Sequence, residues 1–204
     1  MNKRVIGFVG IIALLVCASV TFYLLTGGDN KDDKKVVETD AIKFSKEYTK
    51  VPEKNVFVYR TADEIVKILE NGTGIVFMGF AECPWCQAYA PILNEVVMDI
   101  GIEKIFYCDI RTDRANNTEA YKKIVNLLDD NLDYDEEGNY RVYVPDVTVV
   151  LNGEVVGHDN ETSLIMDSSL TPEAYWTNEK KSDSKSKLET LIDLIVDGSC
   201  VQCE

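Results

Sequence analysis

Short apolar runs and helically spaced apolar residues alternate through the middle of the chain. Runs of strand length, rich in β-branched and aromatic residues, occupy 56–59, 74–80 and 105–108. Segments with apolar residues at helical spacing lie between and after them, at 61–69, 87–97, 120–128 and 187–197. Asn152-Gly153, between two further β-branched runs, predicts a hairpin. Strands that alternate with helices and end in a hairpin predict an α/β domain, with a central mixed sheet flanked by helices.

This domain is expected to span about residues 53–198, a length that can bury a full core without structural disulfides. Thr61 and Glu64 have the spacing of a capping box, which predicts where the first helix begins. Two stretches depart from the alternating pattern. An acidic, turn-rich insertion near 129–141 is expected to form a solvated loop, and a second long loop is expected at 158–186.

The first residues of the chain have the pattern of a membrane anchor. Residues 5–26 contain no charged side chain and, as a helix, are long enough to cross a hydrocarbon layer of about 30 Å. Lys3 and Arg4, within the short N-terminus 1–4, favour a cytoplasmic start, so that the rest of the chain is exported. The alternative is a cleaved signal peptide with a small-residue site near 16–18, although apolar residues continue beyond that site. The sequence favours a single-pass protein of the cell membrane with an extracytoplasmic domain.

Residues 27–52 are rich in Lys, Asp, Glu and Thr and have no sustained apolar period, so we expect a solvated polar tether. The whole chain has a formal net charge of −14, which disfavours nucleic acid and anionic lipid head groups as partners. His158 is the single histidine and has no cysteine, serine or carboxylate motif beside it. We expect it to be a solvent-facing loop residue.

The candidate chemistry centres on Cys83-Pro84-Trp85-Cys86, which joins the strand at 74–80 to the helix that follows. Cys83 would lie at the helix N-cap and Pro84 at the first helical position, where the missing N–H of proline costs nothing. Free backbone N–H groups and the positive end of the helix dipole stabilise a thiolate at that place. Cys86, three residues on, lies on the same helical face and can form a disulfide with Cys83. The spacing predicts a nucleophilic thiol with its resolving partner.

This pair of cysteines has two alternative interpretations. A zinc site would need two further ligands, for which the chain offers the close pair Cys200 and Cys203 near the C-terminus. The single histidine adds no second cluster of ligands, and zinc knuckles usually lie on hairpin turns rather than at the start of a helix. A static structural disulfide is the third interpretation. Redox chemistry is favoured, with no metal and no organic cofactor expected.

The residues around the motif resemble those of thioredoxin-like proteins. Pro91 stands where thioredoxins carry the proline that kinks the active-site helix, and 144–156 is similar to the family's cis-proline strand, turn and final strand. The resemblance covers about 55–198 and implies a thioredoxin-like fold. It also implies a cis peptide bond before Pro145, and a substrate-binding role for Val144 and Pro145 beside the dithiol.

The resemblance has departures. Phe77 replaces the buried carboxylate that thioredoxins and protein disulfide isomerases place six residues before the first cysteine, so proton transfer to and from Cys86 must use another group or water. The proline second in the motif is closer in kind to glutaredoxins and periplasmic disulfide oxidases. Trp85 would supply an apolar substrate-binding surface. The run 79–86 is also similar to the corresponding run of bacteriocin transport accessory proteins.

The remaining cysteines are expected to differ in role. Cys108, in a core strand, and Cys17, in the membrane span, are expected to be inert apolar thiols. Cys200 and Cys203 are expected to follow the last helix, on a short tail at 199–204. They are candidates for a redox relay between the dithiol and a partner, and the alternative is a passive terminal disulfide.

Taken together, these features predict an extracytoplasmic thiol–disulfide oxidoreductase that exchanges disulfides with protein substrates and with a membrane or extracytoplasmic redox partner. The direction of electron flow depends on the relative stability of the oxidised and reduced forms, and no feature of the sequence indicates that stability. The alternative is a membrane-tethered binding or assembly factor that uses a thioredoxin-like groove with little redox turnover, which the replacement at Phe77 leaves open.

Overall fold

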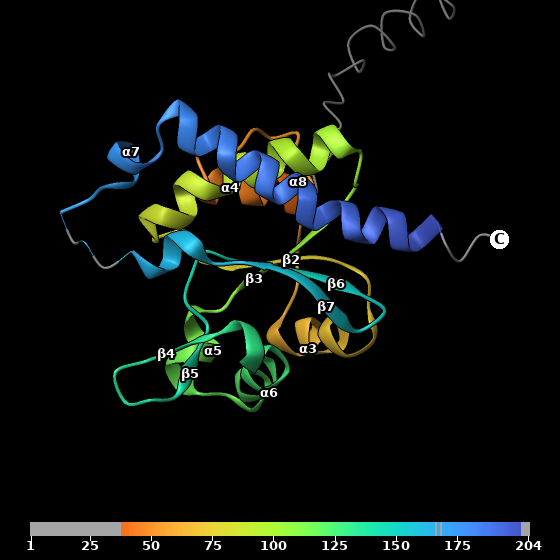
Figure 1. The fold of residues 1–204 in the computed structure, drawn as a ribbon, viewed down its shortest axis with the longest axis vertical. Helices are drawn as coiled ribbons and strands as arrows, with labels where there is room; N and C mark the ends of the chain where they lie inside the picture. The colour runs from red at the N-terminus through yellow and green to blue at the C-terminus, as the bar shows by residue number, and fades with distance from the viewer. Residues whose placement is uncertain (1–37, 166, 168, 201–204) are drawn as a thin grey trace, which may run out of the picture. The chain divides into compact units, whose positions relative to one another are not determined.

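The computed structural model of the chain describes residues 38–165, 167 and 169–200 (Figure 1). Several predictions fall outside these residues, namely those on 1–4, on the anchor 5–26, on the first part of the tether and on Cys203. Within the described residues, no helix is both long and apolar enough to cross a membrane.

A five-stranded mixed sheet forms the centre of the domain, with the strand order β1-β3-β2-β6-β7. The strands are β1 (Phe57–Tyr59), β2 (Gly74–Gly79), β3 (Ile105–Asp109), β6 (Asp146–Leu151) and β7 (Glu154–Asp159). β3 pairs in parallel with β1 and β2, whereas β6 is antiparallel to both β2 and β7. The predicted mixed sheet and its strands are therefore confirmed.

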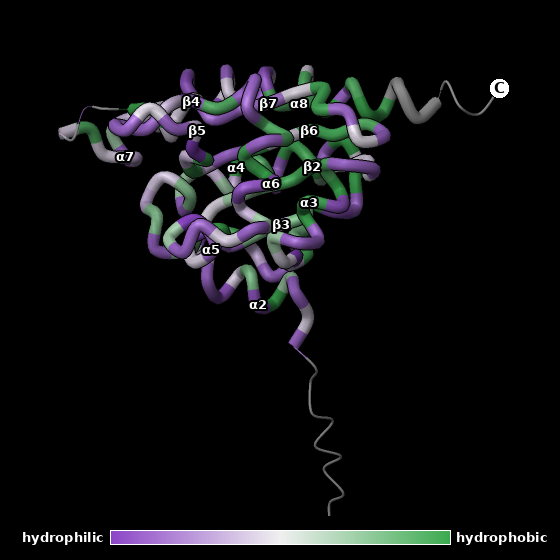
Figure 2. The backbone as a smooth tube through the Cα atoms, turned by 90° about the horizontal axis from the view of Figure 1, so that it is seen from below, coloured by the Kyte–Doolittle hydropathy of each residue, from purple (hydrophilic) through white to green (hydrophobic). Residues whose placement is uncertain are grey.

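Helices cover both faces of this sheet (Figure 1). They are α2 (Asp40–Glu47), α3 (Ala62–Asn71), α4 (Pro84–Ile100), α5 (Arg111–Asn116), α6 (Glu119–Leu128), α7 (Pro172–Tyr175) and α8 (Asn178–Cys200). Side chains alternate across a strand, so Phe77 of β2 packs with α2, α4 and α8, whereas Val76 and Met78 pack with α3 and α6. Figure 2 shows the hydrophobic segments concentrated around β2, β6 and α3, where the two layers of helices meet the sheet.

Two local signals from the sequence are confirmed. The Thr61 hydroxyl accepts a hydrogen bond from the Glu64 N–H, and the Glu64 carboxylate accepts one from the Thr61 N–H, which completes the capping box of α3. Asn152 and Gly153 form the β6–β7 turn with φ values of 53° and 82°. A Cβ on Gly153 would lie only 2.2 Å from the Glu70 carbonyl oxygen, so this turn has room for glycine alone.

The prediction that residues 27–52 form a polar tether is wrong for the second half of this segment. Residues 40–47 form α2, capped by the Thr39 hydroxyl, and Phe44 and Tyr48 are fully buried. The Phe44 ring stacks on Tyr48 at 4.2 Å and on Phe57 of β1 at 3.8 Å between ring centroids. Burial of these two aromatic rings, rather than an apolar period along the segment, attaches α2 to the domain.

The predicted loop 158–186 and tail 199–204 also differ from the structure. The loop contains a 3₁₀ turn, η2 (Glu161–Leu164), then α7 and the first turns of α8. The first turns of α8 are polar and exposed, so they carry no apolar spacing that predicts a helix. The helix continues through Gly198 and Ser199 to Cys200 instead of ending before the tail.

The acidic insertion is a small hairpin rather than an irregular loop. A 3₁₀ turn, η1 (Asp129–Asn131), leads into the paired strands β4 (Asp133–Tyr134) and β5 (Tyr140–Arg141). The rings of Tyr134 and Tyr140 stack across the pair at 4.5 Å between centroids, and their hydroxyls lie 2.9 Å apart. Such cross-strand aromatic pairs stabilise short strands.

Candidate active site

Cys83 caps the N-terminus of α4, as the sequence predicts. Its backbone is extended, Pro84 occupies the first helical position, and the Cys83 Sγ accepts a hydrogen bond of 3.2 Å from the Cys86 N–H. Strand β2 ends at Gly79, so the short connection from 80 to 82 brings the chain from the sheet directly to the helix start. The dithiol therefore lies at the junction of strand and helix.

The surroundings of Cys83 favour its thiolate. A hydrogen bond from the Cys86 thiol, with further ones from the backbone N–H groups of Cys86 and Trp85, outweighs the opposing effect of burial and lowers the pKa of Cys83 to about 7. The positive charge of Arg114 contributes in the same direction. With such a pKa, about half of this thiol is ionised at neutral pH.

Cys86 behaves in the opposite way. It is fully buried, and burial, with the hydrogen bond and charge of Cys83, raises its pKa far above the ordinary value. Both cysteines are free thiols in the structure. One sulfur is thus prepared as an anion while the other keeps its proton, and that proton makes the hydrogen bond which stabilises the anion.

A pair of buried phenols lies behind Cys86. The Tyr48 hydroxyl donates a 3.2 Å hydrogen bond to the Tyr107 hydroxyl, and burial raises the pKa of both groups, so both remain neutral. A Cβ built on Gly79 would lie 3.2 Å from the Tyr48 Oη and 3.3 Å from the Cys86 Sγ, which places these two atoms around the same glycine. Phe77 stands where the thioredoxin-like proteins that the sequence resembles have a buried carboxylate. It is fully buried, and its ring also lies beside Gly79.

Trp85 lies half-buried beside the dithiol. Its ring contacts Tyr175 of α7 edge to face at 5.5 Å between centroids, and Tyr175 contacts Trp176 in the same way at 5.0 Å. Trp176 is buried against Tyr89 of α4. The sequence did not predict that this distant segment supports Trp85, because no local pattern connects the two.

Val144 and Pro145 approach the same end of the sheet. Their peptide bond is cis, as the family resemblance implied. They precede β6, whose first residue, Asp146, pairs with Met78 near the end of β2. Since β2 leads to Cys83, this antiparallel pairing brings the two connections to one edge of the sheet.

Arg114 is a site residue that the sequence analysis missed. It lies on α5, a short helix with no apolar period, where its Nη1 donates a 3.0 Å hydrogen bond to the Val142 carbonyl. The guanidinium lies 5.5 Å from the centre of the Phe80 ring, and its charge favours the ionised forms of Cys83 and Cys86. Sequence alone holds no signal for this role, since the contacts join three separate segments.

The prediction for His158 is wrong. The residue lies within β7, only 9% of its side chain is exposed, and its Nε2 lies 2.8 Å from an Asp146 carboxylate oxygen. Burial lowers the pKa of His158, but the hydrogen bond and charge of Asp146, together with the charge of Asp159, outweigh it and raise the pKa. Asp146 alternates with Val147 along β6, and Val147 faces the layer that holds Cys86. The pair therefore belongs to the opposite face of the sheet from the dithiol.

The structure does not bring Cys200 to the dithiol. α7, which contacts Trp85, lies just before the start of α8, and Cys200 is the last of the 23 residues of α8 (Figure 1). A helix of this length is about 34 Å long. Cys108 is buried in β3, and burial raises its pKa to about 12, as for an inert thiol. Among the described residues, no group of three or more His, Cys, Asp or Glu side chains is placed to hold a metal ion.

No protein-family model matches the chain, and neither the curated proteins nor the solved structures that were searched contain a match to it. The chemistry of the site therefore has to be inferred from its own residues.

Proposed function

We propose that the protein is a thiol–disulfide oxidoreductase with a thioredoxin-like fold, which exchanges disulfides with protein substrates through Cys83 and Cys86. The observation that carries this proposal is the opposite perturbation of the two thiols. Cys83 is favoured as an anion at the start of α4, and Cys86 is held protonated beneath it. Disulfide exchange requires a nucleophilic thiolate for the first step and a thiol that stays protonated until the second step.

Three further features support the thioredoxin-like assignment. The mixed sheet flanked by helices, the dithiol at a strand–helix junction and the cis peptide before Pro145 each agree with what the resemblance implied. On this proposal Trp85, Val144 and Pro145 border the substrate chain. Cys200 and Cys203 remain candidates for exchange with a separate partner molecule.

The chemistry proceeds in two displacements. The Cys83 thiolate attacks a substrate disulfide, forming a mixed disulfide and releasing the first substrate thiolate, which takes a proton from water. Cys86 then gives up its proton, which passes to solvent and replaces the one taken by the first thiolate, and attacks the Cys83 sulfur. The Cys83–Cys86 disulfide forms, the bond from Cys83 to the substrate breaks, and the second substrate thiolate leaves. Two electrons pass from the dithiol to the substrate, and a dithiol reductant restores the protein. In the oxidising direction the same steps run backwards.

The cellular setting is part of the proposal. It rests on the uncharged stretch 5–26 and on the preceding Lys3 and Arg4, which together favour a membrane anchor with the domain outside the cytoplasm. Disulfides form and persist in such compartments. A dithiol on the outer side of the membrane has both substrates and oxidants within reach.

Catalysed reduction of insulin disulfides tests the proposed function. With dithiothreitol as the electron donor, the full-length chain should accelerate insulin precipitation well above the rate with dithiothreitol alone. The second candidate function, a tethered binding or assembly factor, is favoured by the absence of a carboxylate at Phe77. Insulin reduction at the background rate, together with stable capture of unfolded polypeptides, would support that function instead.

Tyr48→Phe tests how Cys86 loses its proton. The Tyr48 hydroxyl and the Cys86 sulfur both lie around Gly79, so the Tyr48 oxygen can accept a proton from Cys86 while Tyr48 passes its own proton to Tyr107 along their hydrogen bond. We expect removal of this hydroxyl to slow decay of the mixed disulfide roughly 10-fold, a modest loss for a proton-transfer group. Quenched-flow mass spectrometry measures that step directly.

The alkylation rate of Cys83 should not change in Tyr48→Phe, which separates a proton-transfer role from a general loss of structure. Tyr59→Phe is the matched control, since the Tyr59 hydroxyl donates instead to the Glu47 carboxylate at 2.6 Å. If the mixed disulfide decays in Tyr48→Phe at the wild-type rate, the Tyr48 hydroxyl has no part in this step.

A further inference from the structure

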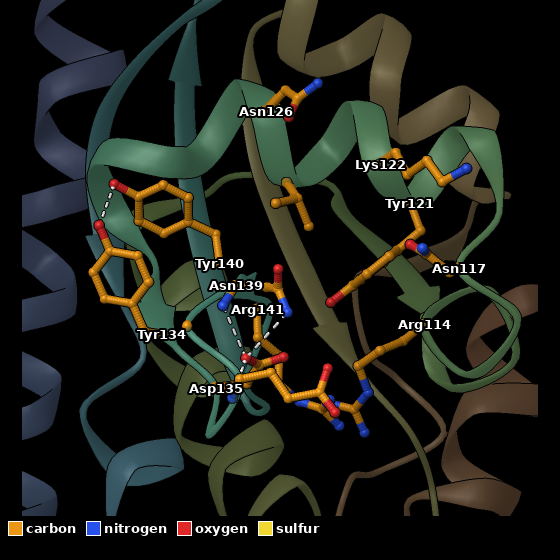
Figure 3. Close-up of a pocket in the computed structure, with 13 residues that line it drawn as sticks. Arg114, Asn117, Tyr121, Lys122, Asn126, Tyr134, Asp135, Asn139, Tyr140 and Arg141 are labelled. Carbon is orange, nitrogen blue, oxygen red and sulfur yellow. Dashed lines mark hydrogen bonds between the residues drawn. The ribbon is translucent and has the colours of Figure 1, made fainter.

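A cavity of about 580 Å³ lies between helices α5 and α6 and the β4–β5 hairpin (Figure 3). One wall is formed by the helices, through Asn117 and Tyr121, and the other by the hairpin, through Tyr134 and Tyr140. This volume falls within the range of small-ligand sites. The acidic insertion, which the sequence predicts to be a solvated loop, thus contributes one side of a polar cavity.

Two arginines reach into this cavity from different elements. Arg114 comes from α5 and Arg141 from β5, and their side chains point into the same end of the cavity (Figure 3). Among the described residues, no carboxylate lies within ion-pair distance of either guanidinium. Lys122, also in the wall, is paired with Glu119 at 2.6 Å. The two guanidiniums are therefore the cations of the described cavity wall that a ligand anion can pair with, although the wall also carries the carboxylates of Asp135 and Glu137.

Two carboxylates, those of Asp135 and Glu137, line the cavity with these arginines, and neither forms an ion pair with a guanidinium. Asp135 accepts hydrogen bonds from the backbone N–H groups of Asn139 at 2.9 Å and Glu137 at 3.0 Å, so its carboxylate holds the hairpin turn. These bonds, together with the positive charge of Arg141, outweigh burial and lower the pKa of Asp135. Glu137 itself is exposed on that turn.

The positions of the two arginines are held by other contacts. Arg114 is fixed by its hydrogen bond to the Val142 carbonyl, and Arg141 lies over the Tyr143 ring at 5.6 Å. Burial, and then the charge of Arg141, lower the pKa of Arg114, which means that the two like charges act on each other. An anion placed between them would relieve that repulsion, and the planar guanidinium matches a carboxylate with two hydrogen bonds.

Arg114 also connects the cavity to the dithiol. Its guanidinium lies over Phe80, whose carbonyl accepts a hydrogen bond from the Cys83 N–H at 3.1 Å. Its hydrogen-bond partner Val142 is two residues before Val144, in the connection that leads to β6. A substrate chain bound at Cys83 would therefore have its neighbouring residues within reach of this cavity.

We propose that the cavity formed by Arg114 and Arg141 binds the carboxylate of an acidic side chain close to the reacting cysteine of a polypeptide substrate. This inference rests on the proposed function and adds a substrate preference to it. The protein would select acidic cysteine-containing segments, even though its own net charge is −14. Local charge at the site, rather than the total charge, sets this preference, because screening weakens distant charges in salt.

Two peptides that differ in one side chain provide the test. Each carries an intramolecular disulfide, with a glutamate near one cysteine in the first peptide and a glutamine in its place in the second. For the full-length chain at low ionic strength we expect kcat/KM to be roughly 10-fold higher for the glutamate peptide, mainly through KM. Added salt should reduce the ratio.

Arg141→Gln should bring the ratio of the two kcat/KM values close to one. Arg60→Gln is the matched control, because Arg60, like Arg141, lies over an aromatic ring but is not part of the cavity. We expect that control to keep the wild-type ratio. Glu137→Gln removes an exposed carboxylate from the cavity wall and should raise the ratio, which provides a second variant if Arg141→Gln does not fold.

Equal kcat/KM values for the two peptides in the wild type, or an unchanged ratio in Arg141→Gln, would overturn the inference while the oxidoreductase function stands. If neither peptide is reduced, the proposed function fails. Calorimetry with unreactive peptides, in which serine replaces both cysteines, then decides the inference separately. Tighter binding of the glutamate peptide supports the carboxylate site, and equal binding removes it.

Discussion

Cys83→Ser is expected to lower catalysed insulin reduction to the background rate, whereas Cys86→Ser is expected to form a mixed disulfide that does not resolve. A serine hydroxyl is not ionised at neutral pH, so the first variant loses the nucleophile that the start of α4 stabilises. The second variant keeps Cys83 and its backbone N–H donors, and lacks only the thiol that completes the exchange. Mass spectrometry of the non-reduced protein, after incubation with a disulfide peptide, shows the trapped species.

Cys108→Ala is the control for this pair. Cys108 is buried in β3 and its pKa of about 12 leaves it protonated, so insulin reduction should continue at the wild-type rate. Full turnover by Cys86→Ser would contradict the resolving role of Cys86. Activity in Cys83→Ser would show that another thiol performs the attack.

Phe44→Ala is expected to lower the free energy of unfolding by about 3–5 kcal/mol, the usual cost of removing a buried phenylalanine ring. Phe44 is fully buried and stacks between Tyr48 and Phe57, so its loss leaves a cavity between α2 and β1. Such a change is a large part of the stability of a typical domain. Urea denaturation followed by tryptophan fluorescence measures it.

Lys46→Ala, on the same helix, is the matched control. Lys46 is largely exposed and pairs with Glu38 on the surface, so its replacement should change the free energy of unfolding by less than about 1 kcal/mol. If Phe44→Ala were as mild as this control, α2 would be a dispensable part of the polar tether, as the sequence alone predicted.

The features that the sequence predicts well are encoded locally. The capping box at Thr61, the Asn152-Gly153 turn and the position of Cys83 at a helix start each depend on residues only a few positions apart. The strands β2 and β3 are likewise recognisable from the length and the residue types of their own apolar runs. For these elements local preference and the final fold agree.

The features that the sequence missed depend on contacts between distant segments. α2 is mostly polar, and the large apolar groups that it and its C-cap bury are the rings of Phe44 and Tyr48. Its pattern is therefore that of a solvated segment until β1 and β3 pack on it. His158 becomes buried because the β6–β7 hairpin brings it to Asp146. Arg114 depends on contacts with Phe80 and Val142, neither of which is its neighbour in sequence.

The candidate site divides in the same way. The two thiols and their order of action follow from the local motif, because the N-cap position and the buried third residue are set by the helix itself. The hydroxyls behind Cys86 and the cavity that contains Arg114 and Arg141 require the whole fold. They come from the end of α2, from β3, from α5 and α6 and from the β4–β5 hairpin. The proposals on substrate choice and on proton transfer therefore depend on the structure and could not be made from the sequence.

The rate of alkylation of Cys83 by iodoacetamide, measured against pH in the reduced protein, tests the central claim most directly. Only the thiolate reacts, so the rate falls as pH drops through the pKa and levels off above it. Our account predicts a midpoint of about pH 7 in the Cys108→Ala background, with Cys86 unreactive over the same range. A midpoint near the ordinary cysteine value of about 8.5, or faster alkylation of Cys86 than of Cys83, would contradict it.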